Sequence, residues 1–108
     1  MNIQIQARHG SLSDASRDKI AEKVEKLGRF VERVSTIDVV VDLATADKPS
    51  VEVVVVTDLK HDFRSSYASG DLFGCVDQVV DKIDQQMRKF KEKLTDHRAK
   101  DVVKGAVE

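Results

Sequence analysis

Basic side chains recur at helical spacing in two segments of this chain. Within each segment they are separated by three, four or seven residues, so they lie along one side of a helix. Lysine and arginine in such a stripe can neutralise the closely spaced phosphates of a nucleic acid, which makes RNA a candidate partner. The first stripe consists of Lys19, Lys23, Lys26 and Arg33, and the second of Lys82, Lys89 and Lys93, with Arg88 and Lys91 further round the helix.

A solvated charged surface is the competing interpretation of these stripes. The chain has 18 Lys and Arg against 19 Asp and Glu, for a net charge of −1. Acids precede bases along the second segment, which complements a helix dipole, and pairs such as Glu22 with Lys26 stabilise a helix without any ligand. Residues 82–100 nevertheless hold seven basic and three acidic residues, more than dipole compensation needs. Both interpretations therefore stay open on charge alone.

Hydrophobic periodicity predicts the elements that must position these stripes. Apolar residues alternate with polar ones in four segments, as in half-buried strands, and recur every three or four residues in two others, as in amphipathic helices. The strands are expected at 2–8, 37–45, 51–59 and 63–69, and the helices at 14–33 and 72–97. The buried positions of the helices are expected to be Ile20, Val24, Leu27, Val31 and Val34, and Leu72, Val76, Val79, Ile83, Met87, Phe90 and Leu94.

This β-α-β-β-β-α order predicts an α+β fold of one domain. A right-handed crossover through the first helix yields a parallel strand pair, and short turns join the remaining strands as an antiparallel meander. Both helices then cover one face of a four-stranded mixed sheet, in a two-layer sandwich. The domain is expected to span 1–98, followed by a flexible tail at 99–108. Acids at strand positions fall on the face away from the helices: Asp38, Asp42, Glu52 and Asp58.

Little in the sequence favours an enzyme or a cofactor site. The histidines His9, His61 and His97 lie in separate segments without the spacing of metal ligands. Cys75 is the only cysteine, so no internal disulfide forms, and we expect it to be a small packing residue. No apolar run reaches the roughly 20 residues of a membrane span. We therefore expect a cytoplasmic, non-catalytic protein without a metal or cofactor.

Two smaller groups of side chains bear on binding. Aromatic rings stack on unpaired bases, but Phe73 and Phe90 fall on or beside the apolar stripe and are expected in the core, while Phe30 and Tyr67 are open cases. A third class of function, a protein-interaction or self-association module, rests on apolar residues of the outer sheet face. These residues are Val40, Val54 and Val56.

Both helical segments carry residues that resemble a known family. The segments 71–73, 76–77, 81–83 and 86–94 are similar to the C-terminal helix of the ribosome hibernation-promoting factor and ribosome-associated inhibitor A family, also called the sigma-54 modulation protein family. Residues 13–15, 17–18, 22–27 and 29–30 are similar to that family's first helix. The resemblance covers roughly residues 2–96, including the order of strands and helices.

The resemblance implies a fold similar to a double-stranded RNA-binding domain with an extra N-terminal strand. It also implies a non-enzymatic protein that binds the small ribosomal subunit, through ribosomal RNA and ribosomal proteins, in the channel used by mRNA and tRNA. Translation is then inhibited under stress or in stationary phase. The free protein is expected to be a monomer, and either a short form or the N-terminal domain of a longer one. The RNA-binding role is carried to Lys23, Lys26, Arg29, Lys82, Arg88, Lys89, Lys91 and Lys93, and to Lys19 and Arg33 on stripe geometry alone.

Overall fold

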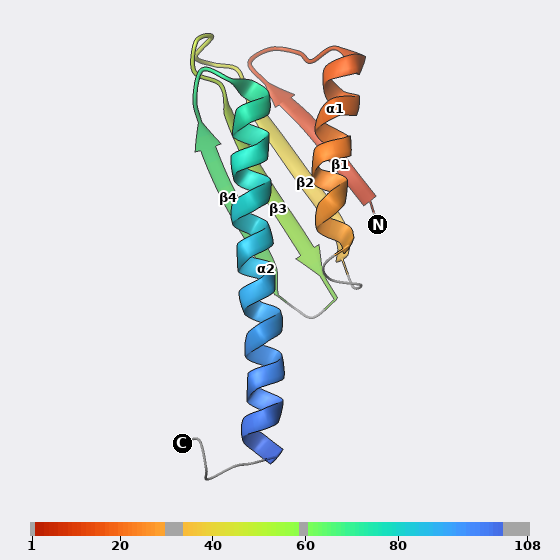
Figure 1. Ribbon diagram of the computed structural model, residues 1–108. Coiled ribbons are helices and arrows are strands. Elements are labelled where there is room, and N and C mark those ends of the chain that lie inside the picture. Colours follow the sequence, from red (N-terminus) through yellow and green to blue (C-terminus); the bar gives the residue numbers. More distant parts are fainter. Residues whose placement is uncertain (1, 30–33, 59–60, 103–108) are drawn as a thin grey trace.

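The chain folds into one sheet with two helices. The computed structural model describes the backbone of residues 2–29, 34–58 and 61–102, and the side chains of these ranges up to Phe90, except that of Arg29. Figure 1 shows the elements in chain order. They are β1 (Asn2–Arg8), α1 (Asp14–Glu25), the 3-10 turn η1 (Lys26–Arg29), β2 (Val34–Asp42), β3 (Ser50–Thr57), β4 (Asp62–Ala68) and α2 (Leu72–Val102).

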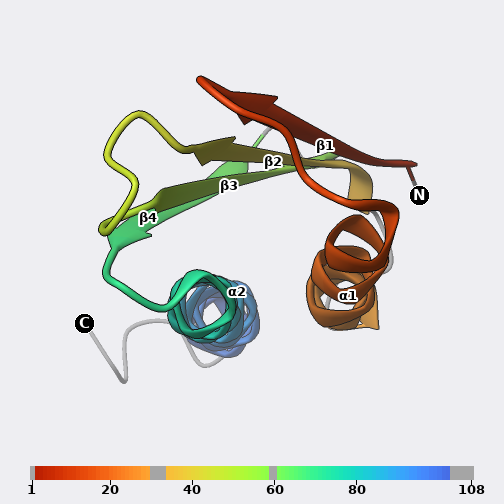
Figure 2. The ribbon, with the colours of Figure 1, turned by 90° about the horizontal axis from the view of Figure 1, so that it is seen from above.

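The sheet has the predicted topology. Its strands lie in the order β1-β2-β3-β4, with β1 parallel to β2 and the other neighbours antiparallel. Both helices lie on the same face of this sheet (Figure 2), and no element of the described residues covers the other face. The α+β sandwich expected from the sequence is therefore confirmed, with the crossover helix α1 over β1 and β2 and the last helix α2 over β3 and β4.

The core lies between the helices and the sheet. Alternate valines of β2 and β3 are buried against the helices, while their neighbours in sequence are half-buried on the open face. Each fully buried aliphatic side chain of this kind contributes roughly 1.5–3 kcal/mol to stability. The largest buried side chains are Phe63, Ile20, Leu27, Ile37, Ile83, Met87, Val24, Val39, Val41, Val51, Val53 and Val55.

The first helix is shorter than its periodicity predicted. Regular α-helix ends at Glu25 and continues as a single 3-10 turn, within which Gly28 lowers helix propensity by about 1 kcal/mol relative to alanine. Val34, expected on the helix stripe, is instead the first residue of β2, where a β-branched side chain packs well. Val31 lies outside the described residues.

The second strand and the last helix also end at other residues than predicted. The strand β2 stops at Asp42, because its carboxylate accepts a hydrogen bond of 2.9 Å from the Ala44 backbone N–H and turns the chain. The helix α2 continues to Val102 and runs well past the sheet (Figure 1), which gives the molecule its long dimension of 55 Å. Flexibility of residues 99–108 stays a prediction, and 103–108 lie outside the described part.

Candidate nucleic-acid interface

The basic side of α1 faces α2. Ser13 caps the helix by accepting a hydrogen bond of 3.1 Å from the Ser16 N–H, and burial of its apolar stripe fixes its rotation about the axis. The ammonium of Lys19 then lies 4.4 Å from the centre of the Phe73 ring on α2. One turn later, Lys23 Nζ lies 2.7 Å from Asp77 Oδ1, also on α2. Lys19 and Lys23 of α1 therefore contact the side of α2 that faces them.

We call this region the helix furrow and define it by Lys19, Lys23, Lys26, Phe73 and Asp77. Lys26 follows Lys23 by three residues at the start of η1 and is exposed, as is Lys19. Lys23 differs from both, because its side chain is only 23% exposed and is paired with Asp77. The furrow is basic, but one of its three lysines already has a carboxylate partner. Sequence spacing within one helix gave no sign of this pair, since its members are 54 residues apart.

The lysines of α2 border the opposite side of that helix. Lys82 Nζ lies 5.7 Å from the centre of the Tyr67 ring of β4, and Lys89 follows Lys82 by two helical turns. Between them, Gln86 Nε2 donates a hydrogen bond of 3.0 Å to the Arg64 backbone carbonyl. We call this side the β4 flank and define it by Arg64 and Tyr67 of β4 and by Lys82, Gln86 and Lys89 of α2.

The two basic stripes therefore do not merge. On each helix the lysines precede the apolar stripe by one residue, and the helices run side by side in the same direction (Figure 1). Because both stripes point the same way, the stripe of α1 faces α2 while the stripe of α2 faces away from α1. The described lysines therefore belong to two separate basic surfaces, the helix furrow and the β4 flank.

The other predicted site residues have various settings. Arg88 is exposed, and its Nε donates a hydrogen bond of 3.0 Å to Asp84 one turn earlier. The side chains of Arg29, Lys91 and Lys93 lie outside the described part, as does all of Arg33.

Acidic residues occupy both the helix layer and the sheet layer. Asp38, Asp42 and Glu52 lie on the open sheet face as predicted, and Asp18, Glu22 and Glu25 are exposed on α1.

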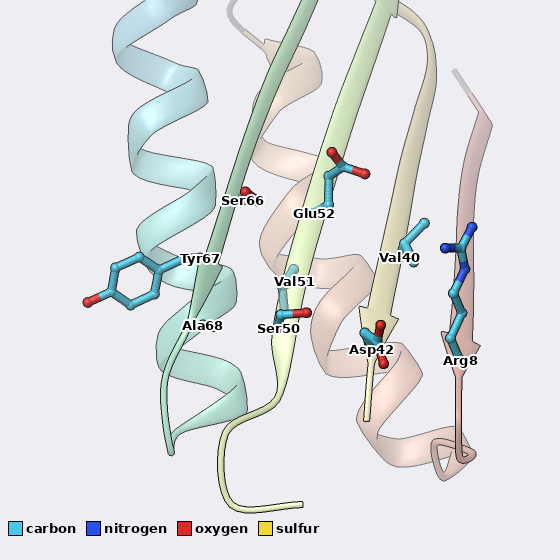
Figure 3. A pocket seen from close by; sticks show the side chains of 9 residues that line it. All are labelled: Arg8, Val40, Asp42, Ser50, Val51, Glu52, Ser66, Tyr67 and Ala68. Carbon is cyan, nitrogen blue, oxygen red and sulfur yellow. The ribbon is translucent and has the colours of Figure 1, made fainter. Parts of the chain in front are cut away.

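The open sheet face has a shallow hollow of about 270 Å³ near one end of the central strands. Figure 3 shows its lining, with Val40 between the side chains of Arg8 and Glu52. At its rim, His9 Nδ1 lies 2.9 Å from Asp42 Oδ1, and the His9 backbone has the uncommon φ of 60°. The hydrogen bond from His9, followed by that from the Ala44 N–H, lowers the pKa of Asp42. This network ties the end of β1 to the end of β2.

Across the ranges described above, no three His, Cys, Asp or Glu side chains are placed to hold a metal ion. Cys75 is fully buried, with its Sγ 3.1 Å from Ser69 Oγ, which agrees with the packing role expected for it. Among the same residues, no helix is long and apolar enough to cross a membrane.

Comparisons with known proteins agree with the fold. A ribosome hibernation promoting factor from Azotobacter vinelandii is 27% identical over 100 residues, which cover 86% of this chain and 85% of that protein. A ribosome hibernation promotion factor from Bacillus subtilis is 33% identical over 97 residues, 87% of this chain, and the match spans only 50% of that longer relative.

Solved structures show the same architecture. The N-terminal domain of Protein Y from Thermus thermophilus superimposes with a TM-score of 0.74 at 28% identity, covering 83% of this chain and 99% of that domain. A ribosomal subunit interface protein from Coxiella burnetii has the same fold, with a TM-score of 0.73 at 22% identity, covering 85% and 99%. The family model described as Sigma 54 modulation protein / S30EA ribosomal protein matches residues 3–95. The chain therefore belongs to the Sigma 54 modulation protein / S30EA ribosomal protein family.

Proposed function

We propose that this protein is a ribosome hibernation factor without enzymatic activity. It binds the small ribosomal subunit in the mRNA and tRNA channel through its helix layer, and so inhibits translation under stress or in stationary phase. The observation that carries the proposal is the helix furrow, in which lysines of α1 are held against α2 on a rigid two-layer scaffold. The names of the relatives from A. vinelandii and B. subtilis support the same role.

The proposed binding is electrostatic and largely independent of base sequence. Ribosomal RNA presents closely spaced phosphates, and each lysine or arginine that neutralises one releases condensed counterions. Folded RNA is recognised mainly by its shape and backbone. The proposed contacts are the described residues Lys19, Lys23, Lys26, Lys82, Arg88 and Lys89, together with Arg29, Arg33, Lys91 and Lys93, which are included on sequence grounds.

Inhibition is steric in this proposal. The molecule measures 55 × 24 × 18 Å, and its sheet and helices share one tightly packed core. A folded body of this size fills a channel that single-stranded mRNA and tRNA must share, and it needs no chemical step to do so. The protein therefore competes with mRNA and tRNA for space.

Co-sedimentation with isolated ribosomal subunits tests this proposal. The protein should sediment with small subunits in preference to large ones, and the bound fraction should fall steeply as salt rises from about 0.05 to 0.5 M, because phosphate contacts are lost to competing cations. Reversing Lys89 and Lys93 to Glu should abolish binding without unfolding the protein. A bound fraction that does not fall as salt rises, or equal binding to both subunits, would contradict the proposal.

A further inference from the structure

Tyr67 is an exposed ring at the edge of the sheet. It lies on β4, the last strand of the sheet, and 39% of its surface is exposed. Figure 3 shows its ring reaching out past the edge of β4 on the side of α2. The Lys82 ammonium lies over this ring, 5.7 Å from its centre, and adds a positive charge there. An aromatic face and a cation are thus presented together to solvent.

His61 presents a second exposed ring at the other end of β4. Its ring stacks on Phe90 of α2, with centroids 4.5 Å apart and an interplanar angle of 19°. The buried Phe63 meets both rings edge-on, at 4.7 Å from His61 and 5.5 Å from Phe90. Thr57 Oγ1 also donates a hydrogen bond of 2.7 Å to the His61 carbonyl. Because the ring is already held in place, a ligand stacking on it would cost little side-chain entropy.

The region between the two rings is rigid and basic. Gln86 Nε2 on α2 is bonded to the Arg64 carbonyl at the middle of β4, so helix and strand edge are fixed together. Lys82 and Lys89 on α2 follow this edge, and both are exposed. Tyr67 follows His61 by six residues of extended chain, which corresponds to about 20 Å. That length suits a short single strand, on the order of 4 nucleotides.

Exposed rings interleaved with lysines are the arrangement that binds unpaired nucleic acid. Bases stack on the rings while the lysines neutralise the backbone phosphates. Paired bases in a duplex cannot offer their faces in this way. The helix furrow differs from this arrangement, because its ring, Phe73, is half-buried. The two basic surfaces therefore differ in the form of RNA that they suit.

We propose that the β4 flank, together with His61, is a binding track for single-stranded RNA. Tyr67 and His61 stack on unpaired bases, and Lys82 and Lys89 contact the phosphates between them. This track deepens the proposed function and rests on it for its biological setting, since its ligand there is unpaired ribosomal RNA. In this proposal the helix furrow contacts the backbone of folded RNA.

A short unstructured RNA oligonucleotide, measured by fluorescence anisotropy with the full chain, tests this track. Tyr67→Ala and His61→Ala should each lower affinity by about 5- to 150-fold, the effect of losing one stacked base. The slope of log affinity against log salt should not change, since no charge contact is lost. Tyr67→Phe, which keeps the ring, should bind like the wild type. Lys82→Gln should instead lower the slope by about 0.7.

Controls separate stacking from a merely structural role. Thermal unfolding shows whether each variant is folded. If His61→Ala does not fold, His61→Phe is the second variant, because it keeps a ring stacked on Phe90. Unchanged oligonucleotide affinity in folded Tyr67→Ala and His61→Ala would overturn the track, as would equal affinity for an RNA duplex. If the wild type sediments with small subunits, but the Tyr67 and His61 variants alter neither oligonucleotide affinity nor sedimentation, the track is refuted and the proposed function is not. Oligonucleotide binding that depends on Tyr67, without sedimentation on ribosomes, would support the track and refute the proposed function.

Discussion

Neutralising two lysines of the helix furrow should weaken ribosome binding by a predictable amount. Lys19 and Lys26 are the suitable pair, because both are exposed, whereas Lys23 is already bonded to Asp77. Each phosphate contact contributes about 0.7 to 0.9 to the slope of log affinity against log salt, so Lys19→Gln with Lys26→Gln should lower that slope by about 1.4 to 1.8. With the affinity extrapolated to 1 M salt unchanged, affinity at 0.1 M falls by roughly 25- to 60-fold.

The assay is a binding titration with isolated small subunits at several salt concentrations. The fold should remain intact, since the contact of Lys19 with Phe73 is worth only about 0.5–1 kcal/mol at an exposed site. The matched control removes two positive charges elsewhere, with Arg8→Gln on the open sheet face and Lys48→Gln in the β2–β3 turn. An unchanged slope in the furrow variant, or an equal loss in the control, would refute the assignment of the furrow.

Three further predictions concern other parts of the molecule. Asp77→Asn should strengthen binding to small subunits several-fold at low salt, because it frees Lys23 and removes a carboxylate from the furrow; weaker binding by a folded variant would show that the pair serves to position Lys23. The pKa of Asp42 is lowered from 3.8 chiefly by the hydrogen bond from His9. Ionised Asp42 therefore stabilises the folded state above pH 3.8, and this stabilisation is lost as the pH falls through the lower pKa that Asp42 has in the folded state. Urea midpoints measured between about pH 2 and pH 5 should therefore fall less steeply in Asp42→Asn and in His9→Ala than in the wild type, and parallel curves would disprove the effect. On the open face, Val54 lies opposite Asp38 and Arg64, and we expect the free protein to be a monomer that Val54→Lys leaves unchanged in sedimentation equilibrium; a wild-type oligomer that this change dissociates would favour a self-association module instead.

The fold followed from the sequence because periodicity and topology agree throughout. The period of two in segments such as 51–57 requires one face buried and one open, and short turns leave only an antiparallel meander for the last three strands. The ends of elements were harder to predict. Periodicity predicted a first helix to Arg33 with an apolar stripe to Val34, but a glycine at position 28 and a β-branched residue at a strand start changed the outcome.

The candidate site was only partly predictable. Spacing identified which lysines border each apolar stripe, and Lys19 and Lys26 are exposed as expected. Spacing could not show which neighbouring helix or strand each lysine stripe faces, because that depends on the relative direction of the two helices. Contacts between distant segments, such as Lys23 with Asp77 or His61 with Phe90, arise only from tertiary packing and leave no periodic signal.

Competition on the small subunit tests the central claim most directly. The affinity of the protein for small subunits would be measured with and without mRNA and initiator tRNA already bound, at one fixed salt concentration. If the folded domain occupies the channel, prior binding of mRNA and tRNA should exclude it, and adding the protein to free subunits should exclude them in turn. Equal affinity for empty and occupied subunits would contradict the claim that this protein silences ribosomes by filling that space.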